Sequence, residues 1–212
     1  MATKLSIYNG ALADLGARRI SSLSEARESR RVLDAYWDQG FVRQVLSEAA
    51  WTFATRTVAL EGSSSIEPSF GYRIAFEKPD DWVRTAALSL DEYLRTPLLE
   101  YRDEAGFWFC DSDLIYVSFV SDGAAYGGDL SLWPANVERY ASLRLAHQSA
   151  KRITESTADK EALKEDMVHA LSKARSTDAM DQPERPLPPG SWSRARHRNS
   201  HLDRGSRNRL LG

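Results

Sequence analysis

The spacing of hydrophobic residues changes twice along the chain, from a helical period to alternation and back to a helical period. Near the start, apolar side chains recur every three or four residues, which is typical of the buried face of an amphipathic helix. Thr3 is placed to cap this helix and Gly16 to end it. The stripe that predicts the helix consists of Leu5, Tyr8, Leu12 and Leu15.

A second, longer stripe predicts a helix of about 25 residues. Ser22 and Glu25 stand at the spacing of a capping box near its start. Gly40 lies inside the stripe and is the point at which we expect the helix to be disturbed. The apolar members of the stripe are Leu33, Tyr36, Trp37, Phe41, Val45 and Ala49.

Beyond Trp51, apolar and polar side chains alternate, as they do in half-buried β-strands. The alternation is clearest at residues 72–76 and 114–119, and turn-forming residues separate such runs. We therefore expect roughly five or six short strands between Thr57 and Val120, arranged as a small antiparallel sheet or barrel. The predicted turns are Gly62–Ser65, Pro79–Asp81, Asp103–Gly106 and Asp111–Asp113.

The helical period returns after Trp133 and Pro134 and predicts a third helix. Pro134 stands at the start of this helix, where its missing N–H costs nothing. A fourth helix follows the third; we expect Thr157 to cap it, and it extends to about Ala179, before Pro183. One side of the third helix carries Val137, Tyr140, Ala141, Arg144, Leu145, Gln148 and Ile153. The inward face of the fourth carries Leu163, Met167, Ala170, Leu171 and Ala174.

These patterns predict an α+β protein with three parts. Residues 1–56 and 130–181 are expected to form a four-helix bundle, because each helix pair is amphipathic and neither could bury its stripe alone. Residues 57–129 are expected to form an inserted β domain, the small antiparallel sheet or barrel. Residues 182–212 are expected to form an extended, basic C-terminal arm.

The composition of the arm separates it from the rest of the chain. The last thirty residues hold four of the eight prolines and seven arginines but only two acids. Such a segment has too little apolar surface to offset the entropy of ordering it, so alone in water it should be disordered. Trp192 lies there with no local core to enter. An aromatic residue among arginines is typical of an interface hot spot; the alternative is an exposed tryptophan without a role.

Composition also excludes several classes of protein. Cys110 is the only cysteine, which rules out an internal disulfide and a cysteine-based metal cluster. No segment approaches the roughly 20 consecutive apolar residues needed to cross a bilayer, and the N-terminus does not resemble a secretion signal. We therefore expect a soluble, globular protein that is made and used without secretion and without membrane association.

Motifs that bind nucleotides or metals are missing from the sequence. There is no phosphate-binding loop, and the glycines at 123, 127 and 128 have the wrong spacing for a dinucleotide site. His147 and His169 lie on different predicted helices, and His197 and His201 in the arm lack a third ligand. We expect neither a cofactor nor a bound metal.

An acidic group surrounds the predicted strand Phe107–Cys110. Paired carboxylates can act as general acid and base or hold a hard cation, although a solvated hairpin end has the same pattern. No apolar pocket or third partner is evident near the group, so we interpret it as a hairpin end. No serine lies in a G-x-S-x-G elbow either, and we expect no enzymatic activity; a small hydrolase that uses the acidic hairpin is an alternative. The acidic residues are Asp103, Glu104, Asp111 and Asp113.

Five segments resemble the head-to-tail adaptors of tailed phages, most closely the tail tubular protein A type of short-tailed phages. The resemblance extends in order through almost the whole chain, up to Arg198. The segments are K-L-S-I-Y-N-G-A-L-A-D-L-G-A-R-R-I-S-S-L-S-E (Lys4 to Glu25), A-W-T-F-A (Ala50 to Ala54), K-P-D-D-W-V-R (Lys78 to Arg84), W-P-A-N-V-E-R-Y-A-S-L-R-L-A (Trp133 to Ala146) and S-W-S-R-A-R (Ser191 to Arg196).

The resemblance implies a structural virion protein, made in the host cytoplasm and located at the head-tail junction. Such adaptors form rings, typically of twelve copies, under the portal, and their other face meets the tail nozzle or tail tube. Genomic DNA passes through the ring without specific binding. Members look like a helical bundle with an inserted β domain and carry no catalytic residues.

Two sets of residues receive roles on this interpretation. The arm is expected to dock on the portal, with Trp192 as its apolar anchor and its arginines paired with portal carboxylates. Neighbouring copies are expected to meet through Arg144, His147 and Arg152. The arginines of the arm that are assigned to portal binding are Arg194, Arg196, Arg198, Arg204, Arg207 and Arg209. The main alternative is a DNA-binding or packaging protein whose arm grips phosphates.

Overall fold

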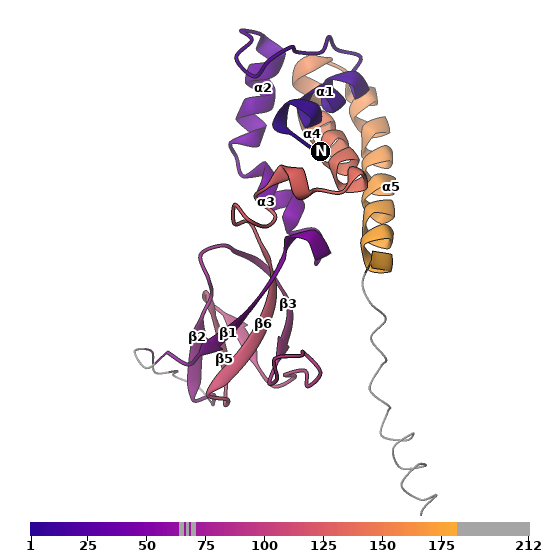
Figure 1. The fold of residues 1–212 in the computed structure, drawn as a ribbon. Coiled ribbons are helices and arrows are strands. Elements are labelled where there is room, and N and C mark those ends of the chain that lie inside the picture. Colours follow the sequence, from indigo (N-terminus) through magenta and orange to yellow (C-terminus); the bar gives the residue numbers. More distant parts are fainter. Residues whose placement is uncertain (64–65, 67, 69–70, 182–212) are drawn as a thin grey trace, which may run out of the picture. The chain divides into compact units, whose positions relative to one another are not determined.

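The computed structural model describes residues 1–63, 66, 68 and 71–181, and these residues form a mixed α+β structure (Figure 1). The described residues contain five α-helices and two antiparallel sheets of three strands each. All the strands lie between the third and fourth helices in the chain, so the β part is inserted into the helical part. The predicted arm, residues 182–212, lies outside the described residues.

The first helix, α1 (Lys4–Asp14), confirms the sequence prediction at both ends. The hydroxyl of Thr3 accepts a hydrogen bond from the amide of Ser6, and the Ser6 hydroxyl caps the Thr3 amide in return. Gly16 adopts a left-handed conformation with φ of 63° just beyond the helix. That conformation has no steric cost for glycine, which explains why the helix ends there.

The prediction of one long second helix is wrong, both in the residue at which the helix starts and in its being continuous. The chain forms two helices, α2 (Glu28–Trp37) and α3 (Phe41–Leu46), because Gly40 takes a left-handed φ of 79° and turns the backbone. Glu25 forms no capping box with Ser22, since its carboxylate accepts hydrogen bonds from Ser21 instead. The predicted four-helix bundle is therefore not confirmed in that form.

The fourth helix, α4 (Ala135–Ile153), is the centre of the helical part and contacts α1, α2 and α5 (Thr157–Asp181). Pro134 precedes α4 as its N-cap residue. The approach of α1 to α4 is very close at Gly10: an added Cβ there would lie only 2.6 Å from the Ser142 hydroxyl oxygen. None of the helices in the described residues is long and apolar enough to cross a membrane.

The six strands form two sheets and, within the described residues, no closed barrel. Of the two predicted arrangements, the sheet is present and the closed barrel is not. The first sheet has the order β1–β6–β3 and the second β2–β5–β4. The strands are β1 (Thr55–Glu61), β2 (Ile74–Glu77), β3 (Trp82–Ser89), β4 (Arg102–Glu104), β5 (Phe107–Cys110) and β6 (Leu114–Ser121).

Each part of the structure has its own hydrophobic core. The helical core surrounds fully buried aromatic residues such as Tyr8, Trp51 and Tyr140. The core of the β part gathers residues from both sheets around Trp108 and Phe119. Cys110 belongs to this second core, and burial raises the pKa of its thiol, which disfavours the reactive thiolate.

Candidate functional site

The acidic group singled out in the sequence does not converge on one point. Asp103 pairs in register with Trp108 and binds Lys78, whereas Asp111 follows the other end of β5 and accepts the amide of Arg73 at 3.0 Å. Among the described residues, no three His, Cys, Asp or Glu side chains are placed to hold a metal ion. The geometry therefore gives no support to a two-carboxylate hydrolase site.

The three residues predicted to contact a neighbouring copy lie on α4 but differ in environment. Arg152 is exposed, whereas Arg144 is mostly buried and bound within its own chain. Burial, together with the charges of Lys160, Lys164 and Arg144, lowers the pKa of His147. Their inter-subunit role stays a prediction. Trp192 and the predicted arginines of the arm lie outside the described residues.

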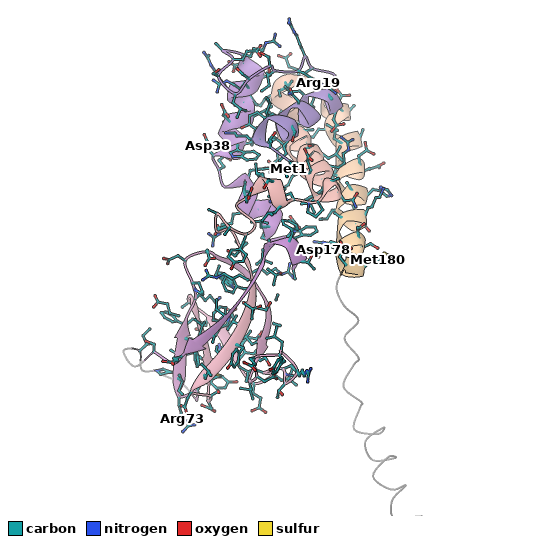
Figure 2. All side chains as sticks on the ribbon, in the orientation of Figure 1. Met1, Arg19, Asp38, Arg73, Asp178 and Met180 are labelled. Carbon is teal, nitrogen blue, oxygen red and sulfur yellow. The ribbon has the colours of Figure 1, made fainter. Side chains whose placement is uncertain are left out.

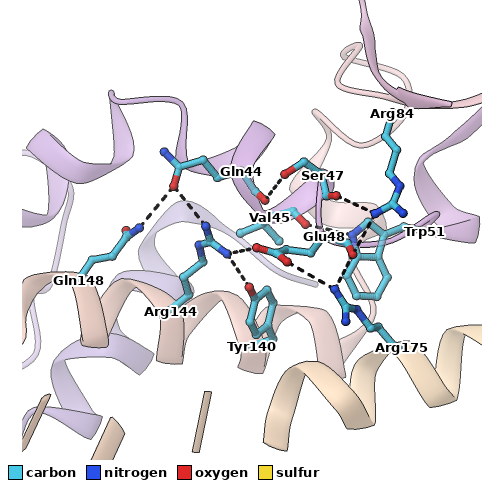
Figure 3. A network of polar contacts seen from close by, with 10 residues as sticks. All are labelled: Gln44, Val45, Ser47, Glu48, Trp51, Arg84, Tyr140, Arg144, Gln148 and Arg175. Carbon is cyan, nitrogen blue, oxygen red and sulfur yellow. Dashed lines mark hydrogen bonds and ion pairs between the residues drawn. The ribbon is translucent and has the colours of Figure 1, made fainter. Parts of the chain in front are cut away.

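A polar network centred on Glu48 connects several elements of the structure (Figure 3). Arg144 of α4 donates to the Glu48 carboxylate and to the Tyr140 hydroxyl, at 2.7 Å from the latter. Arg175 of α5 donates to the Glu48 carbonyl oxygen at 2.6 Å and lies 3.4 Å from its carboxylate. Glu48 therefore joins the two long helices to the segment that follows α3.

Two further arginines carry these contacts into the β part. Arg84 of β3 donates to the carbonyl oxygens of Ser47 and Glu48, at 3.0 and 3.2 Å. Arg43 of α3 pairs with Asp122 at 2.9 Å and also donates to the carbonyl oxygen of Trp82. We call this set of contacts around Glu48, together with Arg43 and Arg84, the junction.

The electrostatics of the junction suit a fixed clamp better than proton transfer. Desolvation opposes the charge of Arg144, but its hydrogen bonds to Glu48 and Tyr140 outweigh that effect and raise its pKa. Burial raises the pKa of the Tyr140 hydroxyl, against the influence of Arg144. The guanidinium therefore stays charged and the phenol neutral at any pH near neutrality. The arrangement therefore holds elements together through a charged guanidinium.

Asp178 makes a second connection between the helical and β parts, and sequence reasoning missed it. Its carboxylate accepts from the Thr52 amide at 3.0 Å and from the Thr52 hydroxyl at 2.7 Å. Asp178, labelled in Figure 2, lies near the end of α5, where a negative charge is unfavourable for the helix dipole. An acidic residue at the C-terminal end of a predicted helix is the feature of the sequence that could have indicated this contact. The contact holds the end of α5 next to the residues that precede β1.

Replacing Asp178 by alanine is expected to lower the free energy of unfolding by about 2 kcal/mol, because two donors of Thr52 would lose their acceptor. Urea denaturation followed by tryptophan fluorescence measures this change. Asp178→Asn is the matched control and should lose less, because its amide oxygen can still accept from both donors of Thr52, which bond to the same oxygen of Asp178. Equal unfolding midpoints for the wild type and the alanine variant would show that the contact contributes nothing.

The described residues therefore contain a connected junction and a buried Asp178 contact, both of which join secondary-structure elements. Neither contains the nucleophile, base and acceptor groups of a catalytic centre. The sequence-predicted Arg144 takes part in the junction, but Glu48, Arg84 and Arg175 could not be singled out from local patterns. Comparison with known proteins found that no protein-family model and no curated protein matches this chain.

Proposed function

We propose that this protein is a structural virion component, the ring-shaped adaptor between the portal and the tail. Twelve copies, the number typical of the family that the chain resembles, pack through a heterologous interface that closes by rotation. The arm docks on the portal, and the other face of the ring binds the tail nozzle or tail tube. The ring extends the channel through which genomic DNA passes without specific binding.

The observation that carries the proposal is the order of the elements. Helices α1 to α3 come first, six strands follow, and α4 and α5 close the described chain. Strands inserted between helices agree with the helical bundle and inserted β domain that the resemblance implies. We propose that the five helices serve as the bundle, with α4 at its centre.

The junction supports the same proposal by a physical argument. A ring closes only if every copy repeats the same angle to its neighbour, so a subunit with two parts needs a stiff connection between them. Glu48, Arg84 and Arg43 supply charged hydrogen bonds across that connection. Such bonds are stronger and more directional than neutral ones.

The distribution of charge agrees with a DNA channel. The formal charge of the chain is −2, and the seven arginines and two acids of residues 183–212 give that segment +5. The rest of the chain is therefore strongly acidic. An acidic lumen repels phosphates, whereas a basic lumen would bind DNA by counterion release and slow its passage. If the residues lining the ring proved to be mainly lysine and arginine, this part of the proposal would be wrong.

The direct test mixes the purified full-length protein with the portal protein encoded in the same genome. We expect rings seated coaxially on portal rings in negative-stain images, and a mass in light scattering that equals the two rings combined. The protein alone and the portal alone are the controls. A chain that stays monomeric and never migrates with the portal would contradict the proposal.

The arginine-rich arm favours one alternative, a DNA-binding or packaging protein. Seven arginines could neutralise several phosphates. Binding of that kind falls steeply as the salt concentration rises, because each neutralised phosphate releases a counterion. A protein contact anchored by Trp192 would weaken far less, so the salt dependence separates the two functions.

A further inference from the structure

Exposed apolar side chains gather in one loop of the β part. Ten large hydrophobic residues are exposed among the described residues, and half of them come from the connection between β3 and β4 or from the first residue of β6. The others are scattered. We call residues 90–101 the β3–β4 loop. These five side chains are Leu90, Tyr93, Leu99, Tyr101 and Leu114, of which the first four belong to the loop.

This loop lies at the end of the sheet that is farthest from the junction. Ser89, the last residue of β3, pairs with Tyr116 near the start of β6, and Pro97 returns to bridge Ser89. At the opposite end of β6, Val120 pairs with Thr55, three residues after the Thr52 that Asp178 binds. The β3–β4 loop and the end of α5 are thus at opposite ends of the β1–β6 pair.

Hydrogen bonds to the Asp91 carboxylate hold the β3–β4 loop in one conformation, and we call these hydrogen bonds the brace. Its carboxylate accepts the amides of Tyr93 at 2.9 Å and Arg95 at 3.1 Å, the amide of Thr96, and the Ser89 hydroxyl at 3.2 Å. The guanidinium of Arg95 also lies over the Tyr93 ring, 5.2 Å from its centroid. A loop that is already ordered loses little conformational entropy on binding, so its exposed side chains can contribute more to affinity.

The brace persists over the whole pH range in which a virion assembles. Desolvation acts to raise the pKa of Asp91, but the amide and hydroxyl hydrogen bonds from Arg95, Thr96 and Ser89 lower it from 3.8 to about 2. A depressed carboxyl pKa gives stability that is fully present above the ordinary value and is lost as the pH falls through the folded value. The loop should therefore keep its conformation down to about pH 4.

We propose that the β3–β4 loop is a docking surface for the tail-side protein of the ring, a partner that presents an apolar pocket with a basic rim. Tyr93 is 70% exposed and Leu99 is 82% exposed, so both side chains are accessible to a partner. This inference rests on the proposed function, and it assigns the tail-side contact to particular residues.

The charges around the loop indicate the chemistry of that partner. Exposed carboxylates lie within the loop and on the neighbouring strand ends, where they outnumber the exposed guanidinium groups of Arg95 and Arg102. The carboxylates repel the phosphates of DNA and favour basic side chains on a protein partner. The end of α5 lies at the other end of the β1–β6 pair from this loop. The exposed carboxylates are Glu61, Glu92, Glu100 and Asp113.

The test uses the full-length protein and the purified tail nozzle or tail tube protein encoded in the same genome. The double variant Tyr93→Ser with Leu99→Ser removes two exposed side chains, and we expect it to bind the tail protein at least about tenfold more weakly. The matched control is Leu132→Ser with Val168→Ser, which removes two exposed apolar side chains elsewhere and should bind like the wild type. Ring mass and portal binding are measured in parallel and should not change in either variant.

A second variant tests the brace without removing the apolar side chains. Asp91→Ala should accelerate hydrogen exchange at the amides of Tyr93, Arg95 and Thr96 and weaken tail-protein binding by a smaller factor. Faster exchange with unchanged affinity would overturn the role of preorganisation and with it the loop as the docking surface.

Three further outcomes would overturn the inference. Unchanged affinity of the double variant would place the tail contact elsewhere. A changed ring mass would assign the loop to the interface between copies. Competition by a peptide of residues 183–212 would make the arm of this chain the occupant. A wild-type protein that binds neither portal nor tail protein would overturn the proposed function itself, whereas portal binding with a loop-independent tail contact would overturn the loop alone.

Discussion

Replacing Glu48 by alanine is expected to lower the free energy of unfolding by about 3 kcal/mol, because it leaves the mostly buried Arg144 without a carboxylate. The Arg144 side chain is only 19% exposed, and its Nε already has no hydrogen-bond partner among the described residues. Arg175 is more exposed, so its own loss adds little. Urea denaturation monitored by circular dichroism and by tryptophan fluorescence measures the change.

Two controls separate the charge of Glu48 from its position. Glu28→Ala removes an exposed carboxylate that lies 3.9 Å from Arg31, and should change the free energy of unfolding by less than about 0.5 kcal/mol. The double variant Glu48→Gln with Arg144→Met removes both charges and should recover part of the loss, since no buried charge is left unpaired. An alanine variant as stable as Glu28→Ala would show that the junction is not a structural clamp.

Local periodicity was sufficient to predict the elements whose stabilising contacts are close in sequence. Thr3 and Gly16 mark the two ends of α1 as expected, since capping and left-handed turns depend on residues a few positions away. The alternation at residues 114–119 predicted the strand that the structure shows as β6. This strand lies between β1 and β3 in its sheet, and its Ile115 and Val117 are buried. The insertion of strands between helices followed from the change of period.

The break at Gly40 shows where a hydrophobic stripe is ambiguous. Phe41 and Val45 are fully buried, as the stripe predicts, yet they belong to a separate helix. A stripe records which side chains are buried and does not record the direction of the backbone that carries them. The left-handed Gly40 changes that direction without exposing the apolar residues after it.

The junction and the two-sheet arrangement depend on contacts between distant segments. Glu48, Arg84 and Arg175 belong to three separate elements, and none stands in a local motif. Strand order is likewise non-local, because β6 pairs with both β1 and β3. Arg144 could be predicted to lie at a contact, but the structure places its guanidinium against Glu48 of its own chain.

A protein shortened to residues 1–181 is expected to fold like the full chain and to bind the portal at least about a hundredfold more weakly. All the core residues of the described chain lie between Ala2 and Ala174, so the deletion removes none of them. Asp178 and its contact to Thr52 are retained as well. Many identical arms in one ring add their affinities by avidity, so losing all of them has a large effect.

Thermal unfolding and portal binding of the shortened protein, measured side by side, check the two halves of this prediction. A fall in Tm by more than a few degrees would mean that the arm belongs to the folded core. A peptide of residues 183–212 provides the complementary measurement: at about 0.15 M salt it should bind purified portal more tightly than duplex DNA. The reverse order would favour the DNA-binding alternative, since seven arginines without a protein partner would act on phosphates alone.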